Sequence, residues 1–285
     1  MKTLHLQSPA KVNLRLEVLG KRTDGYHDLK MVMCRISLFD EVVLTLNDDN
    51  NISVVCDNDM VPCGEDNIAW KAANAFKKAT CINNGIHIQI KKRIPMGGGL
   101  GGGSSNAATV LLGLDSLTGN TLSKEKLMEM GLKLGADVPF FIYKKPALAE
   151  GIGERLSPIS GLPELSLILV NPAIEISTAS IFNSLNLGLT KPIEPPSITK
   201  FNCSLSEVIA ILHNDLEDVT FKKYPEVKMV KEMLHHHGAA GVLMSGSGST
   251  VFSLYLNHEK AETAFTRIKQ EAASNGWFAF LAKSL

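Results

Sequence analysis

Alternating apolar and polar positions predict strands in the first third of the chain. Residues 86–90 alternate isoleucine with histidine and glutamine, and a strand is predicted at 85–92. Other short, β-branched segments bounded by Gly, Asp and Asn predict strands at 3–10, 11–19, 30–39, 41–46 and 52–56. Apolar residues at helical spacing predict helices at 66–79, from the end of a glycine-rich segment to about 118, and at 123–134. Asp66 is the expected N-cap of the first helix and Gly135 the expected end of the last.

The remaining chain reads as strand, helix, strand, strand, helix, strand, which describes an α+β lobe with its helices on one face of a sheet. Strands are predicted at 165–170, 241–244, 250–256 and 277–282, and helices at 178–185, 204–212, 225–236 and 258–275. Residues 157–163 are rich in Pro, Ser and Gly, so we place a domain boundary there, with domains at 1–158 and 159–285. The proline-rich segment 191–196 is expected to be an exposed connector.

Composition describes an ordinary globular protein. With 285 residues, of which 45% are hydrophobic, the chain can bury a substantial core. Lys plus Arg and Asp plus Glu are equal at 29 each, so no overall charge attracts nucleic acid or an anionic membrane. No apolar run approaches a membrane span and no signal peptide is evident, which predicts a cytoplasmic protein. Five cysteines without a C-x-x-C pair suggest neither a disulfide framework nor a zinc site.

Six glycines and two serines form the most distinctive segment, which is preceded by a predicted strand and followed by a predicted helix. Glycine lets consecutive backbone N–H groups approach an anion closely, with the positive end of the next helix behind them. The segment therefore predicts a phosphate-binding loop. Its residues are Pro95, Met96, Gly97, Gly98, Gly99, Leu100, Gly101, Gly102, Gly103, Ser104 and Ser105.

Other kinds of glycine loop fit this segment less well. A flexible linker would have polar flanks, whereas these flanks are apolar and periodic. A Walker loop needs lysine before its Ser or Thr, and Gly103 stands there. The dinucleotide pattern is matched formally, but the acidic residue that follows, Asp115, lies in the same predicted helix instead of after a second strand. The other motifs of protein kinases are absent.

Three further patterns could contribute chemistry. Lys11 and Asn13 lie two apart on a predicted strand and so share a face, although a lysine on an edge strand is also common without any function. A charged turn at 20–28 carries Tyr26 and His27 at its tip. A second small-residue turn, 245–249, joins two predicted strands and could approach a ligand closely.

These motifs resemble those of the GHMP kinases. P-A-K-x-N-L at 9–14, the glycine loop, and the turn within 244–252 resemble the three family motifs in order. D-G-Y-H at 24–27, N-A-A-T at 106–109 and L-G-A-D-V-P at 134–139 resemble the members that act on 4-diphosphocytidyl-2-C-methyl-D-erythritol, and only the segment 191–237 matches loosely. The resemblance implies a two-lobed α+β fold, with an N-terminal lobe like ribosomal protein S5 domain 2 and a ferredoxin-like C-terminal lobe.

The resemblance also implies a reaction and the groups that perform it. Members of this kind transfer the γ-phosphoryl group of ATP to the C2 hydroxyl of the methylerythritol unit, in the non-mevalonate route to isoprenoid precursors. Asp137 matches the general base and Lys11 the lysine that holds this hydroxyl, although Asp137 alone would read as a helix N-cap. Asn67 and Lys92 match positions near the adenine and ribose. Mg²⁺ is expected with ATP, with Ser105 as its most plausible protein contact and no certain metal ligand.

The acceptor site is implied in the same way. Asn13 matches a residue that touches the methylerythritol hydroxyls, and Thr178 also falls at a substrate position. Tyr26 and Phe182 match a pair that stacks on the cytosine ring, and His27 matches the residue that reads its edge. The expected partner is thus a small molecule with a cytidine diphosphate group.

Two alternatives remain open at this point. One is another small-molecule GHMP kinase of the homoserine or mevalonate type, against which the D-G-Y-H turn and Phe182 count. The other is a nucleotide-binding protein without catalysis, which would not need Lys11 or Asp137.

Overall fold

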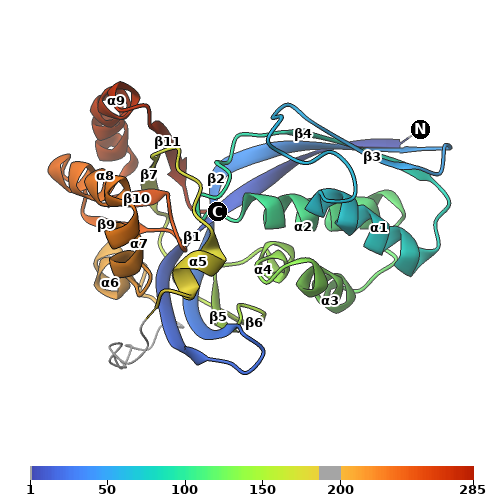
Figure 1. The fold of residues 1–285 in the computed structure, drawn as a ribbon, viewed down its shortest axis with the longest axis horizontal. Coiled ribbons are helices and arrows are strands. Elements are labelled where there is room, and N and C mark those ends of the chain that lie inside the picture. Colours follow the sequence, from blue (N-terminus) through green and yellow to red (C-terminus); the bar gives the residue numbers. More distant parts are fainter. Residues whose placement is uncertain (1, 186–199) are drawn as a thin grey trace. The chain divides into compact units, whose positions relative to one another are not determined.

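The computed structural model describes residues 2–185 and 200–285, so the proline-rich connector expected at 191–196 lies outside the described residues (Figure 1). The described residues form two compact units that are discontinuous in sequence. Unit 1 comprises Met1–Ala10, Phe39–Ile94 and Gly101–Lys144, and unit 2 comprises Lys11–Leu38, Pro95–Leu100 and Lys145–Leu285. The first two strands, β1 (Lys2–Lys21) and β2 (His27–Asn47), contribute residues to both.

This division into two compact units differs from the domain boundary expected between residues 158 and 159. The reason lies in β1 and β2, which are long enough for each to pass from one unit to the other. Their sequences were predicted as pairs of shorter strands, 3–10 with 11–19 and 30–39 with 41–46, and each pair is one continuous strand. Asp40 suggested a break within β2, but its side chain is fully buried and hydrogen-bonded inside unit 1. The assignment of family domains to 1–158 and 159–285 stays a prediction.

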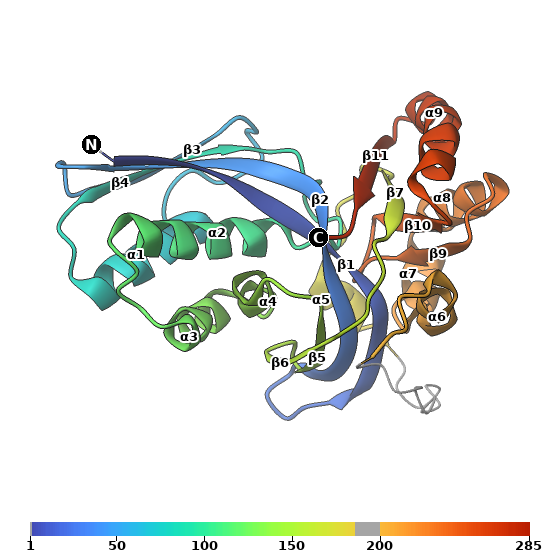
Figure 2. The ribbon, with the colours of Figure 1, turned by 180° about the vertical axis from the view of Figure 1, so that it is seen from behind.

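Unit 1 combines a small sheet with the helices α1 to α4. β3 (Ile52–Cys56) is parallel to β4 (Gly85–Lys91), and β4 is antiparallel to the end of β2, where Leu44 pairs with Ile88. The helices α1 (Ile68–Thr80) and α2 (Gly102–Leu117) lie side by side along one face of these strands, and α3 (Lys124–Leu134) and α4 (Val138–Tyr143) pack beside them (Figure 2). Phe76, Ile86 and Leu111 are fully buried in this core.

Unit 2 contains a four-stranded antiparallel sheet in the order β11-β7-β10-β9. Its strands are β7 (Ser166–Asn171), β9 (Gly241–Met244), β10 (Val251–Tyr255) and β11 (Phe278–Lys283). Helices α8 (Pro225–His236) and α9 (His258–Ser274) pack on this sheet. Every residue of β7 and β10 is buried, and the predicted sequence of strands and helices is found here.

Unit 2 also contains several shorter elements, some predicted from the sequence and some not. β5 (Ala147–Gly151) pairs with β2 and with β6 (Arg155–Pro158), and the two-residue β8 (His213–Asn214) is parallel to β1. Helix α5 (Thr178–Phe182) is shorter than expected, α6 (Leu205–Ile211) matches its prediction, and α7 (Glu217–Lys223) was not predicted. Strands of two to five residues depend on partners far away in sequence and leave little periodicity to detect.

Helix ends follow local chemistry, with one correction. Asn67, not Asp66, is the N-cap of α1, and its side chain accepts a hydrogen bond from the backbone N of Ala69 at 2.8 Å. Gly135 ends α3, as predicted. All five cysteines are free thiols. Within the described part of the chain, no helix is long and apolar enough to cross a membrane.

Candidate active site

The glycine loop crosses the boundary between the two units. Its first part, Pro95–Leu100, belongs to unit 2, and its second part, from Gly101 onward, belongs to unit 1 and opens helix α2. Each part therefore has its own supporting contacts.

In unit 2, the first part of the loop lies against the turn at 245–249. The hydroxyl of Ser245 donates to the carbonyl of Gly99 at 3.0 Å, and the backbone N of Thr250 donates to the carbonyl of Gly98 at 3.2 Å. Gly99 has φ +73°, and a Cβ there would lie 2.0 Å from the carbonyl oxygen of Ser245. Only glycine fits such a position. The structure thus brings together two of the motifs found in the sequence.

Asparagine side chains hold this arrangement, and sequence reasoning missed them. Asn171, at the end of β7, donates to the hydroxyls of Ser249 and Thr250 at 3.2 and 3.0 Å. Asn214, in β8, donates to the carbonyls of Met244 and Gly246, both at 2.8 Å. Both side chains are buried. A single asparagine carries no local signal, because its role comes only from the distant backbone that it contacts.

Lys11 and Asn13 share one face of β1, as their spacing predicts. The Lys11 ammonium donates to the Asn13 side-chain oxygen at 2.5 Å, and both residues are buried. The backbone N of Lys11 also donates to the carbonyl of Leu100 at 3.0 Å. The lysine proposed for catalysis therefore lies beside the first part of the glycine loop, within unit 2.

The aromatic residues expected to hold a base come together in part. The rings of His27 and Phe182 lie with centroids 5.1 Å apart and planes tilted by 30°. Burial, and secondarily the charge of Lys21, lower the pKa of His27 below its ordinary value, so its ring is neutral at neutral pH. Tyr26 is 59% exposed at the tip of the turn. The tip is ordered by Asp24, which accepts the backbone N–H of Tyr26 at 3.1 Å.

Thr178 begins helix α5, which carries Phe182. Its hydroxyl is 2.9 Å from that of Ser247, so α5 is tied to the same turn that supports the glycine loop. Ser177 caps the helix by accepting from the backbone N of Ser180.

In unit 1, the second part of the loop forms the start of a 16-residue helix. Gly101 is the N-cap of α2 and has φ +69°. Because glycine has no side chain, it makes no capping hydrogen bond to the first N–H groups of the helix. A helix start of this kind favours an anion. Gly103 is exposed, Ser104 is half-buried, and Ser105 is fully buried with its hydroxyl accepting from Ser8 at 2.8 Å.

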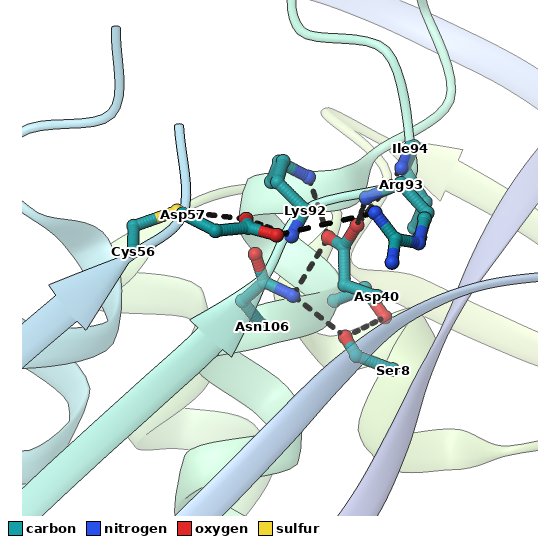
Figure 3. A network of polar contacts seen from close by, with 9 residues as sticks. Ser8, Asp40, Cys56, Asp57, Lys92, Arg93, Ile94 and Asn106 are labelled. Carbon is teal, nitrogen blue, oxygen red and sulfur yellow. Dashed lines mark hydrogen bonds and ion pairs between the residues drawn. The ribbon is translucent and has the colours of Figure 1, made fainter. Parts of the chain in front are cut away.

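A buried polar network surrounds the same helix start (Figure 3). The Asp40 carboxylate binds the Lys92 ammonium at 2.5 Å and the Asn106 side-chain amide at 2.9 Å. Lys92 was expected near the adenine and ribose, and in this structure its side chain is 7% exposed and forms an ion pair with Asp40. Sequence reasoning identified Lys92 as a site residue, whereas Asn106 stood out only as the first residue of the N-A-A-T motif and Asp40 not at all.

Asp137 and Asn67 stand at helix starts in unit 1. Asp137 occupies the N-cap position of α4, but its side chain makes no capping hydrogen bond, which does not support its interpretation as a plain helix cap. Asn67 does cap α1, and its amide also donates to the carbonyl of Pro62 at 2.7 Å. Lys11 and Asp137 belong to different units, and their joint action stays a prediction.

The described residues provide no all-protein cage for Mg²⁺, an ion that substrate phosphates and water commonly help to hold. They include no group of three His, Cys, Asp or Glu side chains that could hold a metal. Ser105, the expected contact, is fully buried and its oxygen already accepts a hydrogen bond from Ser8.

Comparison with known proteins identifies the family. Residues 67–145 match the GHMP kinases N terminal domain, and residues 203–274 match the GHMP kinases C terminal domain. Two curated relatives, from a Geobacter species and from Geobacter metallireducens, are 52% and 50% identical over all of both chains. Both are named 4-diphosphocytidyl-2-C-methyl-D-erythritol kinase. This chain belongs to that family of GHMP kinases.

Solved structures agree with this placement. A crystal structure of 4-(cytidine 5'-diphospho)-2C-methyl-D-erythritol kinase matches with a TM-score of 0.82, 32% identity and 99% coverage of each chain. A homoserine kinase from Cytophaga hutchinsonii matches with a TM-score of 0.73 at 19% identity, covering 100% of this chain and 95% of its own. The second likeness concerns the fold alone. The two-lobed α+β fold expected from the sequence is confirmed, and the protein is a small-molecule kinase.

Proposed function

We propose that this kinase transfers the γ-phosphoryl group of ATP to the C2 hydroxyl of 4-diphosphocytidyl-2-C-methyl-D-erythritol, giving the 2-phosphate and ADP. The observation that carries the choice of acceptor is the His27–Phe182 ring pair, with centroids 5.1 Å apart. A flat base can stack against one such ring and be read at its edge by the other. Homoserine and mevalonate offer no ring, and their kinases resemble this chain at only 19% and 14% identity.

The glycine loop would bind the triphosphate. Backbone N–H groups from Gly98 to Ser104 would surround the phosphates, and the start of α2 adds a favourable dipole, while the N–H of Ser105 donates to the carbonyl of Gly101 at 2.8 Å. Asn67 and Lys92 contribute on the adenine and ribose side. Phosphoryl transfer depends mainly on positioning and on neutralising charge, so a rigid loop is a large part of the catalysis. Mg²⁺ accompanies ATP in this proposal, held by phosphates and water.

The acceptor would be held by residues of unit 2 and deprotonated by Asp137. Asn13 and Thr178 contact the acceptor, Tyr26 and Phe182 stack on its cytosine, and His27 reads the cytosine edge as a neutral ring. Lys11 holds the C2 hydroxyl and lowers its pKa, and Asp137 accepts its proton.

A coupled assay of ADP release tests the proposal with three acceptors, namely 4-diphosphocytidyl-2-C-methyl-D-erythritol, homoserine and mevalonate. We expect turnover with the first alone. Turnover of homoserine or mevalonate at a comparable kcat/KM would overturn the choice of acceptor. ATP binding by calorimetry without turnover of any acceptor would instead favour a nucleotide-binding protein without catalysis.

A further inference from the structure

One carboxylate in unit 1 is saturated with hydrogen bonds. The Asp40 side chain is 0% exposed, and each of its oxygens accepts from two donors. Oδ1 accepts from the backbone N of Arg93 at 2.7 Å and of Ile94 at 2.8 Å. Oδ2 accepts from the Lys92 ammonium at 2.5 Å and the Asn106 amide at 2.9 Å (Figure 3). Such a buried charge is stable only while these donors stay in place.

The donors lie at the two ends of the glycine loop. Arg93 and Ile94 directly precede Pro95, the first residue of the loop, and Asn106 directly follows Ser105, the last. Asp40 therefore joins the entrance of the loop to its exit. We call Asp40 with the backbone of Arg93 and Ile94 and the side chain of Asn106 the loop clasp.

Further contacts extend the clasp into the first turns of α2. Asp40 can only accept, so Asn106 must present its amide hydrogens, one to Asp40 and one to the Ser8 hydroxyl at 3.0 Å. Ser8 in turn donates its single proton to the hydroxyl of Ser105 at 2.8 Å. The direction of the whole chain of hydrogen bonds thus follows from the Asp40 carboxylate.

Lys92 adds a second tie between the loop ends. Its ammonium lies so close to Gly102 that a Cβ on this glycine would be 2.8 Å from Nζ. A positive charge at the start of a helix is unfavourable by itself, because the helix start is also positive. Asp40 compensates that charge, which keeps the ammonium against the first turn of α2.

A loop with six glycines has many conformations to lose when it binds a ligand. Fixing its two ends restricts those conformations before the ligand arrives, and preorganisation of this kind raises affinity without any new contact. We propose that Asp40 is a positioning residue for ATP: through the loop clasp it holds the glycine loop in the form that binds the triphosphate. This inference rests on the proposed function, since it names a residue that prepares the same nucleotide site.

Asp40→Asn tests the proposal with a change of one atom. Asparagine keeps the size of the side chain, but it removes the charge and replaces one accepting oxygen with a donor, which faces the Lys92 ammonium or the backbone amides. We expect the KM for ATP and the Kd of ATP by calorimetry to rise about tenfold. The KM of the acceptor should not change. A residue that only stabilises the fold would lower Tm and the active fraction without separating the two KM values.

Two further variants make the test decisive. Asp115→Asn is the matched control, because Asp115 is a buried carboxylate at the other end of α2 that accepts from the backbone N of Leu122 at 3.0 Å. It should lower Tm and leave the affinity for ATP unchanged. Asn106→Ala removes only the exit side of the clasp and should weaken ATP binding less than Asp40→Asn does, and it supplies the measurement if Asp40→Asn does not fold.

The outcomes separate this inference from the proposed function. Wild-type turnover of the cytidine acceptor, measured first, decides the proposed function, whereas the calorimetric Kd of ATP needs no acceptor. Unchanged ATP affinity in a folded Asp40→Asn or Asn106→Ala protein would overturn the positioning role. An equal loss of ATP affinity in Asp115→Asn would overturn it as well, since any destabilisation of α2 would then suffice.

Discussion

In the proposed function, the glycine loop and the turn at 20–28, which we call the cytidine turn, recognise their ligands by different means. In the loop, backbone groups are proposed to bind the phosphates, and the neighbouring side chains are buried and hydrogen-bonded to each other, as in the contact of Ser8 with Ser105. In the turn, side chains are proposed to bind the cytosine: Tyr26 is 59% exposed, and His27 forms a ring pair with Phe182 from a distant helix.

The difference follows from the ligands. A triphosphate carries charge in all directions and is satisfied by a nest of N–H groups, which glycine supplies without any side chain. A neutral pyrimidine has a flat face and one hydrogen-bonding edge, and only rings and polar side chains can match these. Phosphate binding should therefore be lost when the backbone of the loop is disturbed. Cytosine binding should be lost when one side chain is shortened.

The largest effect should come from Asp137, which belongs to neither region. Asp137→Asn removes the proton acceptor at constant size, so kcat should fall about 10²- to 10⁴-fold while both KM values stay within a small factor. Steady-state kinetics with each substrate varied measures the split.

Lys11→Met is measured alongside Asp137→Asn, because the effects of substituting two residues that act as a unit on kcat do not add. It should also be severely impaired, and the double variant should be less than additively worse. Near-normal turnover of Asp137→Asn at neutral pH would contradict the assignment of the base.

Disturbing the backbone of the glycine loop should weaken ATP binding and leave acceptor binding unchanged. Gly101 has φ +69°, so Gly101→Val places a β-branched side chain in a strained conformation and crowds the phosphate site. We expect the Kd of ATP to rise about 100-fold or more, with acceptor binding retained in calorimetric titrations. Gly119→Val is the matched control, since Gly119 has φ +99° with nothing near its missing Cβ and lies outside the loop. Equal ATP affinities in the two variants would refute backbone recognition by the loop.

Removing one aromatic ring should weaken binding of the cytidine acceptor and leave ATP binding unchanged. Phe182→Ala removes the partner of His27, and stacking is worth about 1–3 kcal/mol per base, so the KM of the acceptor should rise roughly 5- to 150-fold. The KM of ATP should not change. Phe278→Ala serves as the control, because Phe278 is an exposed aromatic on β11. A parallel loss for both substrates would show that Phe182 is only structural.

The smallest expected effect is a pH dependence of the acceptor KM that the KM of ATP does not share. Burial and Lys21 keep the pKa of His27 below its ordinary value of 6.5, so the neutral ring prevails at neutral pH. As pH falls through the lowered pKa, protonation should raise the acceptor KM. Stability should fall in the same window, from 6.5 downward, because the unfolded chain binds the proton first. A flat acceptor KM below pH 6.5, or an equal rise in the KM of ATP, would argue against reading of the cytosine edge by His27.

Elements with strong local signals were predicted well. Residues 85–91 and 241–244 form strands as their periodicity indicates, and Ser123 and Gly135 bound α3 as expected. The glycine loop is predicted as a phosphate site from its own residues alone, and that assignment stays a prediction. For Lys11, Asp137, Tyr26 and Phe182 the roles came only through the family resemblance, since each residue alone has an ordinary structural explanation.

The sequence by itself determined the helices and strands with clear periodicity, the glycine loop and the shared face of Lys11 and Asn13, because these depend on residues a few positions apart. Only the tertiary structure decided the ring pair of His27 with Phe182, the binding of Ser245 to Gly99, and the loop clasp of Asp40. These contacts join segments that are 50 or more residues apart, and nothing within either segment specifies its partner. The division into two units is also a tertiary result, since it depends on how far β1 and β2 continue after their local signals weaken.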